Sequence, residues 1–252
     1  MPEVSIITPC YNSEEFIYQT LHSVKLQRYK DFEHIIVIDE DNPVRKQRLK
    51  EIISEFDHKI KVIETAGKTG ASNSRNIGIK ESRGNYLAFL DSDDSWHPDK
   101  LGLQINFMKK NNISISHSNY AQVDENGDYV KNRLSPKKIS YNSLLISPRI
   151  GCLTVIAKKA LFDHTEPFPN FPCRNDYAAW LKIFKKASSF NCNEILAFYR
   201  VRRGSISSNS CKNIKGHYDV LNKQEGYPPP ITLFFIFSNF FIKFLDLLFL
   251  RR

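Results

Sequence analysis

The sequence predicts an α/β fold built on an open, largely parallel β-sheet. Strand patterns alternate with helix patterns over roughly the first 110 residues, which is typical of βαβ units. Acidic clusters directly follow two of these strands, at the sheet edge where such folds bind ligands. The chain has 252 residues, 41% hydrophobic and 25% charged, and can therefore bury one sizeable core.

The first strand is predicted over residues 4–9, a β-branched run that Pro9 closes. Residues 11–13, Tyr-Asn-Ser, form a turn and cap before a helix over residues 14–27. Residues 34–38 are a continuous apolar run, as expected of a strand buried on both faces of a parallel sheet. The chain therefore begins as strand, helix, strand.

The same alternation continues with a helix over 45–56, a strand over 60–63 and a helix over 71–81 that begins after a glycine-containing turn. A fourth apolar strand is predicted over 86–90, and a further helix begins near Pro98. The first half thus has four strands whose carboxyl ends meet at one edge.

The second half is less regular. Strands are predicted over 113–117 and 154–156 and a helix over 176–186, with a polar, loop-rich stretch between them. We find no internal repeat and no clean boundary within this part. We expect one domain over 1–226, with two halves (1–110 and 111–226), and a distinct apolar segment over 227–252.

Charge and cysteine content restrict the partners and the compartment. The formal net charge of +9 favours anionic partners. The basic residues are spread along the chain, which argues against nucleic-acid binding. Five cysteines (Cys10, Cys152, Cys173, Cys192 and Cys211) lie far apart without a Cys-x-x-Cys pair, so we expect reduced thiols. The N-terminus lacks the pattern of a signal peptide, and we expect a cytoplasmic catalytic part.

The segment Asp91-Ser92-Asp93-Asp94 places several carboxylates on one loop after a buried strand. Such a loop can hold a hard divalent cation whose other ligands are diphosphate oxygens, and the cation would offset charge on a leaving diphosphate. The alternative is a helix cap, with Asp94 or Ser95 at the start of the next helix.

Two further sites are informative beside this loop. Asp39 ends its strand at the same sheet edge and could accept hydrogen bonds from a nucleobase, or could belong to a solvated turn. The run from Gly70 to Gly78 places small residues and Arg75 at a helix start, where backbone amides and a guanidinium suit a phosphate.

In combination these segments resemble the bacterial family 2 glycosyltransferases, which are inverting enzymes with the GT-A fold, a Rossmann-like mixed α/β sheet. The resemblance covers roughly residues 3–210, and it implies a nucleotide-sugar-binding half over 1–110 and an acceptor-binding half over 111–226. Its segments are the strand and loop over 4–12, the strand ending at Asp39, the Ser-Arg-Asn-Ile-Gly helix over 74–78, and residues 86–101 with their Asp-x-Asp loop.

The resemblance implies roles for individual residues. The donor nucleotide sugar, by family habit a UDP-sugar, would contact residues of the first loop, the second strand end, the third helix, the Asp-x-Asp loop and the late Tyr-Arg segment: Pro9, Tyr11, Asn12, Asp39, Arg75, Asp91, Ser92, Asp93, Arg200 and Arg202. Asp93, with Asp91, would bind Mn²⁺ or Mg²⁺. Asp176 would be the general base that deprotonates the acceptor hydroxyl. Without the resemblance, the pattern around Asp176 predicts only a helix cap.

The chain departs from the family pattern in two places. Paired acids are common in relatives after the second strand and before the late helix, whereas this chain has Asp39-Glu40 and Asn175-Asp176. Arg202 stands where a His is common. The principal carboxylates remain. The role of the family's histidine, however, does not transfer directly to Arg202.

The apolar segment over 231–250 carries Thr232, Asn239, Lys243 and Asp246 as a narrow polar stripe on a helix. This predicts an amphipathic helix on the surface of a membrane. A helix buried against a partner and a true membrane span are the alternatives. A peripheral place on the inner face of the cell membrane would suit a lipid-linked, polyprenyl-diphosphate saccharide acceptor.

The resulting hypothesis is an inverting, metal-dependent hexosyltransferase in cell-surface polysaccharide synthesis, such as that of lipopolysaccharide O-antigen or capsule. Two alternatives remain at this point. One is a sugar-1-phosphate nucleotidyltransferase, although Tyr11-Asn12 stands where such enzymes carry a glycine-rich phosphate loop. The other is a non-catalytic membrane-associated scaffold of the same fold.

Overall fold

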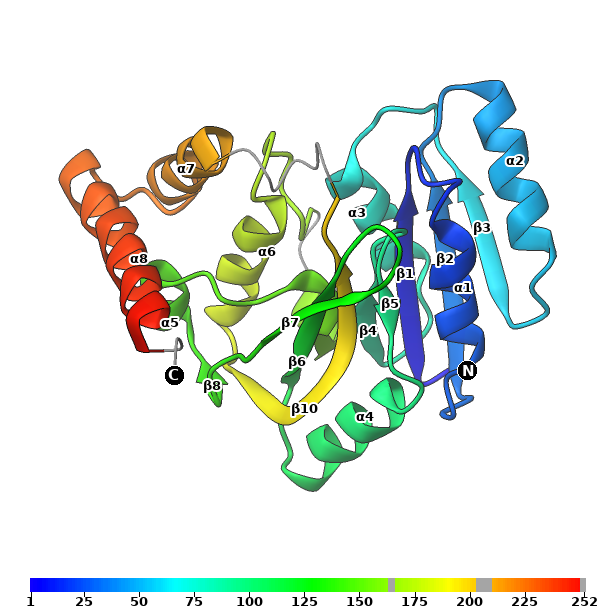
Figure 1. Cartoon of the computed structure of the whole chain (residues 1–252), viewed down its shortest axis with the longest axis horizontal. Helices are drawn as coiled ribbons and strands as arrows, with labels where there is room; N and C mark the ends of the chain where they lie inside the picture. The colour runs from blue at the N-terminus through cyan, green and yellow to red at the C-terminus, as the bar shows by residue number, and fades with distance from the viewer. Residues whose placement is uncertain (163–165, 203–209, 250–252) are drawn as a thin grey trace.

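A computed structural model describes residues 1–162, 166–202 and 210–249. In this part of the chain one ten-stranded mixed sheet forms the centre, with helices on both sides (Figure 1). The main path of the sheet has the order β3-β2-β1-β4-β9-β6-β10-β5, while β7 pairs with β6 and β8 with β10.

The first four strands are parallel. β1 (Val4–Cys10) pairs with β2 (Phe32–Ile38) and β4 (Tyr86–Phe89), and β3 (Ile60–Glu64) pairs with β2. β1, β2 and β4 are almost entirely buried, as expected for apolar runs covered on both faces. The predicted strands of the first half are thus confirmed, with ends displaced by one or two residues.

The second half is mixed. β9 (Ile156–Lys158) runs antiparallel between β4 and β6 (Ile115–Val123), and joins the two halves into one sheet. The remaining strands are β5 (Ser95–Trp96), β7 (Tyr129–Arg133), β8 (Lys138–Ile139) and β10 (Ser189–Arg200). The prediction of a strand over 154–156 was wrong by two residues, because Cys152–Thr154 is a 3₁₀ turn.

The helices are α1 (Ile17–Lys25), α2 (Pro43–Ser54), α3 (Ala71–Glu81), α4 (Lys100–Lys110), α5 (Tyr141–Ile146), α6 (Asn175–Phe184), α7 (Ser210–Asp219) and α8 (Pro229–Phe249), with a π-helical turn over Val220–Gln224. α2 begins two residues before its predicted start. Asn42 is the reason, since its side-chain oxygen accepts from the amides of Val44 and Arg45 at 3.0 and 3.1 Å.

α3 packs directly on the centre of the sheet. A Cβ atom at Gly78 would lie 2.5 Å from a methyl carbon of Ile7 in β1, so only glycine permits this approach. One turn earlier Arg75 points to the end of β4. The packing of α3 on β1 therefore fixes where that guanidinium lies.

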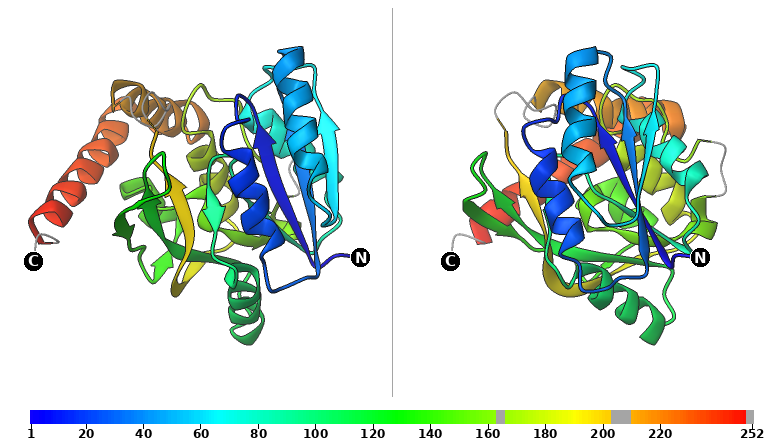
Figure 2. Two further views of the ribbon diagram at one scale, coloured as in Figure 1. Left: turned by 45° about the vertical axis from the view of Figure 1, so that its right-hand side comes forward. Right: turned by 90° about the vertical axis from the view of Figure 1, so that its right-hand side faces the viewer.

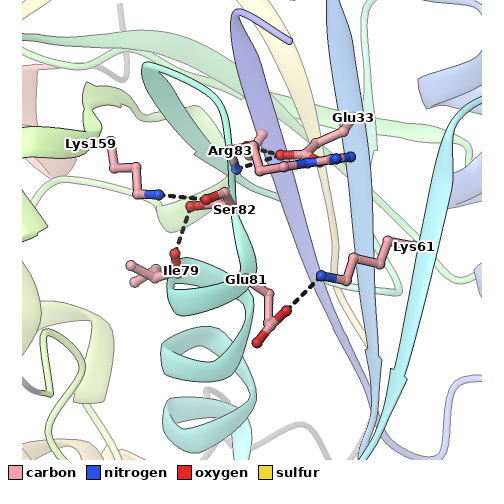
Figure 3. A network of polar contacts seen from close by, with 8 residues as sticks. Glu33, Lys61, Ile79, Glu81, Ser82, Arg83 and Lys159 are labelled. Carbon is pink, nitrogen blue, oxygen red and sulfur yellow. Dashed lines mark hydrogen bonds and ion pairs between the residues drawn. The ribbon is translucent and has the colours of Figure 1, made fainter. Parts of the chain in front are cut away.

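A polar network lies at the amino-terminal ends of the strands, at the edge of the sheet opposite to the acidic clusters (Figure 3). The Glu33 carboxylate accepts from Ser5 Oγ at 2.7 Å and from the Arg83 amide at 2.6 Å. Lys159 reaches the Ser82 carbonyl from the second half of the chain. These contacts stabilise the sheet and α3 at a distance from the acidic clusters, which follow the carboxyl ends of the strands.

α8 packs beside α5 and α7 on the flank of the body (Figure 2). Its polar residues Thr232 and Asn239 are buried against the protein, while five of its phenylalanines are 48–69% exposed: Phe234, Phe237, Phe240, Phe241 and Phe244. Among the helices that the structure describes, none combines the length and apolar character needed to cross a membrane.

Candidate active site

The sequence-predicted site residues gather at the carboxyl ends of β2, β1 and β4. β1 lies between the other two, so the loop after Cys10 is flanked by Asp39 on one side and by the Asp91–Asp94 loop on the other. Burial, with the nearby charges of Asp91 and Asp93, raises the pKa of the Cys10 thiol to about 12. The floor of the site is therefore a neutral thiol beside carboxylates.

Asp39 organises the loop that leads into α3. Its Oδ1 accepts from the amide and the hydroxyl of Thr69 at 3.0 and 2.7 Å and from the Thr65 hydroxyl, and its Oδ2 accepts from the Gly70 amide at 2.7 Å. Burial alone would raise the pKa of Asp39, but these hydrogen bonds lower it below its ordinary value. Asp39 is thus a fixed carboxylate at the predicted nucleobase position.

The first loop is held by a residue that the sequence interpretation did not assign. Glu40 is buried and accepts from the amides of Asn12 and Asn42, both at 3.0 Å. Asn12 has a left-handed backbone (φ 49°), and its side chain accepts from Arg45 at 2.6 Å. The neighbouring Tyr11 is exposed. Glu40 therefore sets the loop that carries Tyr11 and Asn12.

Arg75 lies at the centre of the site. It is 5% exposed, and its Nη2 donates to Asp91 Oδ1 at 2.5 Å, while its guanidinium lies over the Phe168 ring at 5.4 Å. Burial disfavours the charged form, but the nearby Asp91, Cys152 and Asp176 raise the pKa of Arg75 above its usual range. Asp91 and Asp176 are thus both near enough to this buried guanidinium to raise its pKa.

α3 also connects the two halves of the chain through hydrogen bonds of Ser72 and Asn76. Asn76 makes two hydrogen bonds to the backbone of Phe168, at 2.8 and 2.9 Å, and the Ser72 hydroxyl donates to the carbonyl of Pro169 at 3.0 Å. The Ser-Arg-Asn segment, which the sequence placed near phosphate, therefore shapes the wall of the site as well.

The acidic loop, Asp91–Asp94, follows β4 and contacts two arginines. Arg200 is the last residue of β10, and Arg202 lies two residues after it. Arg202 Nη2 lies 2.5 Å from Asp93 Oδ2, and the Arg200 amide donates to Asp94 Oδ1 at 2.9 Å. Burial, and then the charge of Asp91, raises the pKa of Asp93, although Arg202 opposes this. Asp94 is buried and its pKa is raised further, by burial and by Asp93 and Asp91. Ser92 is buried within the same loop.

Arg200, predicted to contact the donor, is engaged with the protein itself. Its Nε donates to the Asp93 carbonyl at 2.9 Å, its Nη1 donates to the carbonyls of Asp124 and Glu125, and its Nη2 donates to Gln19. A pocket of about 350 Å³ lies beside it, lined by residues of α1, β5, the β6–β7 hairpin and β10. In this structure Arg200 positions the acidic loop.

Asp176 lies in the first turn of α6, after Arg174 in a left-handed conformation (φ 63°). Its Oδ1 accepts from the Tyr177 amide at 2.8 Å. The helix-cap interpretation of Asp176 was wrong, because Arg174 is the N-cap of α6 and no side chain caps this helix. Its hydrogen bond to the next amide occupies one carboxylate oxygen, and the other can accept from another partner.

Cys152 is a site residue that the sequence did not reveal. It is buried in the 3₁₀ turn before β9, and its pKa is raised well above the ordinary value, by burial first, with Arg75 opposing and Asp91 and Asp176 adding to the shift. No motif surrounds it, so only the fold brings it to Arg75.

Two carboxylates of one loop are chemically suited to a hard divalent cation, with the remaining ligands coming from a diphosphate and water. Asp91 and Asp93 each face a guanidinium, so a cation bound here would share these carboxylates with Arg75 and Arg202. Over residues 1–162, 166–202 and 210–249 no group of three or more His, Cys, Asp or Glu side chains is arranged to hold a metal by itself. A cation at these two carboxylates would need further ligands from outside the chain, such as phosphate oxygens.

Comparison with known families agrees with this arrangement. The model of the family described as "Glycosyl transferase family 2" matches residues 5–164. The chain belongs to glycosyl transferase family 2. It is accordingly a glycosyltransferase, and the nucleotidyltransferase and scaffold alternatives are set aside.

Two relatives illustrate the family. A glucosyltransferase of Escherichia coli, named UDP-Glc:alpha-D-GlcNAc-diphosphoundecaprenol beta-1,3-glucosyltransferase WfgD, is 40% identical over 222 residues, covering 86% of this chain and 85% of the relative. The putative teichuronic acid biosynthesis glycosyltransferase TuaG of Bacillus subtilis is 35% identical, covering 89% of each chain.

Solved structures share the fold. S. aureus TarS 1–349 in complex with UDP-GlcNAc superposes with a TM-score of 0.69 at 21% identity, covering 88% of this chain. The chain spans 65% of that TarS fragment. The mannosyltransferase PcManGT from Pyrobaculum calidifontis, solved with GDP-Man and Mn²⁺, gives a TM-score of 0.68 at 14% identity over 94% of this chain and 68% of that one. At these identities the likeness concerns the fold alone.

Proposed function

We propose that the protein transfers a hexose, with inversion, from a UDP-sugar to a hydroxyl of a polyprenyl-diphosphate-linked saccharide. The observation that carries the proposal is the group around Arg75, which donates to Asp91 of the acidic loop and whose pKa is raised by both Asp91 and Asp176 of α6. In this proposal the leaving diphosphate lies at Asp91, the acceptor hydroxyl lies at Asp176, and the two flank the anomeric carbon on opposite faces. This is the geometry of a single in-line displacement.

The donor would lie across the carboxyl ends of the first strands. Pro9, Tyr11 and Asn12, with Asp39, would contact the nucleotide, because Glu40 and the loop at Thr65–Gly70 fix the positions of these groups. Arg75 and Arg202 would face the diphosphate as guanidinium donors. Arg200 would contribute through its hold on the acidic loop.

Asp93 and Asp91 would hold Mn²⁺ or Mg²⁺ together with the diphosphate. The cation would offset the charge that develops on the leaving group. Asp176 would accept the proton of the acceptor hydroxyl, a contribution of roughly 10²- to 10⁴-fold in rate for a general base.

The acceptor proposal rests on the relatives and on α8. WfgD is named for a GlcNAc-diphosphoundecaprenol acceptor, and it matches 86% of this chain. The exposed phenylalanines of α8, with the net charge of +9, suit a peripheral position on an anionic membrane surface, on the cytoplasmic side. A lipid-linked acceptor would be available there, and the product would enter cell-surface polysaccharide.

The test is a donor and acceptor screen with stereochemical analysis. The full chain is incubated with UDP-glucose, UDP-galactose or UDP-GlcNAc, a GlcNAc-diphospholipid acceptor, and Mn²⁺ or EDTA, and released UDP is measured. We expect UDP to be released from one of the three donors, and only when Mn²⁺ is present. Asp176→Asn should lower kcat at least a hundredfold, and Asp93→Ala should lose the response to Mn²⁺. Asp57→Asn, at an exposed surface pair with Lys25, is the control.

NMR of the product then gives the new linkage. A β-linkage from the α-configured donor supports single displacement with Asp176 as base. An α-linkage would rule out this mechanism, even if the enzyme is active.

A further inference from the structure

Both carboxylates proposed to hold the cation already face a guanidinium of the same chain. Arg75 Nη2 lies 2.5 Å from Asp91 Oδ1, and Arg202 Nη2 lies 2.5 Å from Asp93 Oδ2. A cation that binds Asp93 Oδ2 would therefore have to take the place of the Arg202 nitrogen.

The two arginines differ in how firmly they are held. The Arg75 side chain is 6% exposed and is enclosed between α3 and the ring of Phe168. The Arg202 side chain is 32% exposed, and its guanidinium lies 5.2 Å from the centre of the Phe16 ring. The Nε atoms of both arginines lack a hydrogen-bond partner among the described residues, so the difference between them is their burial. Arg202 can thus exchange its partner, whereas Arg75 cannot without repacking the core.

Phe16 provides a platform that does not depend on the anion. Arg200 lies 5.0 Å from the same ring, so the ring contacts two guanidinium groups. A guanidinium retained on an aromatic face can turn from one acidic partner to another with little loss of contact. The position next to Asp93 places Arg202 within reach of a diphosphate bound at the acidic loop.

We propose that Arg202 is a built-in counter-ion that occupies the cation position on Asp93 until the nucleotide diphosphate arrives. The diphosphate then takes over the guanidinium, and Asp93 becomes free to bind the divalent cation. Cation and nucleotide consequently bind with positive coupling, which is reciprocal. This inference rests on the proposed function, since it assumes that Asp93 is a metal ligand.

The experiment measures Mn²⁺ binding by electron paramagnetic resonance on the full chain, without nucleotide and with UDP. Binding of Mn²⁺ by UDP itself is subtracted from a titration without protein. The variants are Arg202→Met, which keeps an unbranched side chain without charge, and Asp93→Ala. Arg28→Met is the matched control, because it removes an arginine that pairs with Asp99 at 2.8 Å. Circular dichroism verifies that each variant is folded.

We expect UDP to strengthen Mn²⁺ binding of the wild type at least tenfold. Arg202→Met should bind Mn²⁺ without nucleotide at least fivefold more tightly than the wild type. UDP should strengthen its Mn²⁺ binding by a smaller factor than in the wild type, because the diphosphate ligands remain but no counter-ion is displaced. The Mn²⁺ affinity of Phe16→Leu without nucleotide should lie between those of the wild type and Arg202→Met, because the variant lacks the aromatic ring that holds Arg202. Arg28→Met should behave as the wild type, and Asp93→Ala should lose the site.

Two results would overturn the inference, and they differ in meaning. If the wild type binds Mn²⁺ with UDP but Arg202→Met binds it no better without nucleotide, Arg202 is not the counter-ion, and the metal proposal survives. If no variant binds Mn²⁺, or Asp93→Ala binds it as the wild type does, the metal role of Asp93 fails and the inference fails with it.

Discussion

Lys100 is a buried cation without a carboxylate partner among the described residues. Its ammonium donates to the Thr154 carbonyl at 3.2 Å and to Gln104, and lies 5.0 Å from the centre of the Trp96 ring. Burial lowers the pKa of Lys100 to about 7. In the unfolded chain a lysine titrates near its ordinary value of about 10.4.

Between pH 7 and pH 10 the unfolded chain therefore binds more protons at this position than the folded one. The contribution of Lys100 to the free energy of unfolding should rise with pH in this window, by about 1 kcal/mol per pH unit, and should be flat below it. Urea unfolding at pH 7.0, 8.0 and 9.0 tests this. Lys100→Met should lower the measured slope by this amount, whereas Lys110→Met, exposed on the same helix, should leave the slope unchanged. An unchanged slope in Lys100→Met would contradict the prediction.

Individual site residues were predictable where chain motifs mark them. Asp39, Asp91, Asp93 and Arg75 follow strands or begin a helix, and the structure brings them to one edge. Glu40 and Cys152 were not assigned, because their roles arise from hydrogen bonds and proximity across the fold. Arg200 carries the same charge as Arg202, yet its donors are used internally, and charge alone could not distinguish the two.

At the scale of elements, α3 is the part most sensitive to a small change. Gly78→Ala would place a methyl group 2.5 Å from Ile7, so α3 must shift and carry Arg75 with it. We expect a loss of about 1–3 kcal/mol in the free energy of unfolding and at least a tenfold weaker affinity for UDP. Urea unfolding and calorimetric titration measure the two effects.

Gly102→Ala in α4 is the control for that variant. The nearest atom to its added methyl group would be 3.8 Å away, an ordinary contact. Alanine in place of glycine in a helix should then be neutral or stabilise by up to about 1 kcal/mol. Equal effects of the two substitutions would show that close packing on β1 is not the cause.

α8 leads to a separate prediction about location. Phe237→Glu with Phe241→Glu places two charges on the exposed apolar face. Burying a glutamate at a lipid surface is unfavourable, so binding to vesicles containing phosphatidylglycerol should fall at least tenfold in a sedimentation assay. Activity on a water-soluble acceptor should be unchanged. Leu103→Glu, at an exposed leucine of α4, should leave vesicle binding intact.

The elements show why the second half was harder to predict. β10 has twelve residues but carries a polar stretch around Asn191 and Asn193, with a left-handed Asn193 (φ 65°) and shifts in its pairing to β6. Such an irregular strand has no alternating pattern to detect. α8, in contrast, has the predicted length, although its polar stripe is buried against the protein at Thr232 and Asn239.

At the scale of the whole molecule, one sheet passes through both halves. β9 pairs with β4 and β6, and Trp180 of α6 packs against Phe89 of β4 with ring centres 5.9 Å apart. We therefore expect both halves to unfold together. In urea, the transition followed by tryptophan fluorescence should coincide with that followed by far-ultraviolet circular dichroism. Separated midpoints would mean that the halves unfold independently.

The place of β9 has a consequence for synthesis on the ribosome. β1 to β4 leave the exit tunnel first and can assemble as a parallel sheet, but β4 keeps one edge unpaired until Ile156–Lys158 emerge, about 70 residues later. At about 5–20 residues per second this interval lasts several seconds. An unpaired strand edge attracts other chains during that time. Slower translation of this stretch should therefore increase the demand for chaperones that bind the nascent chain.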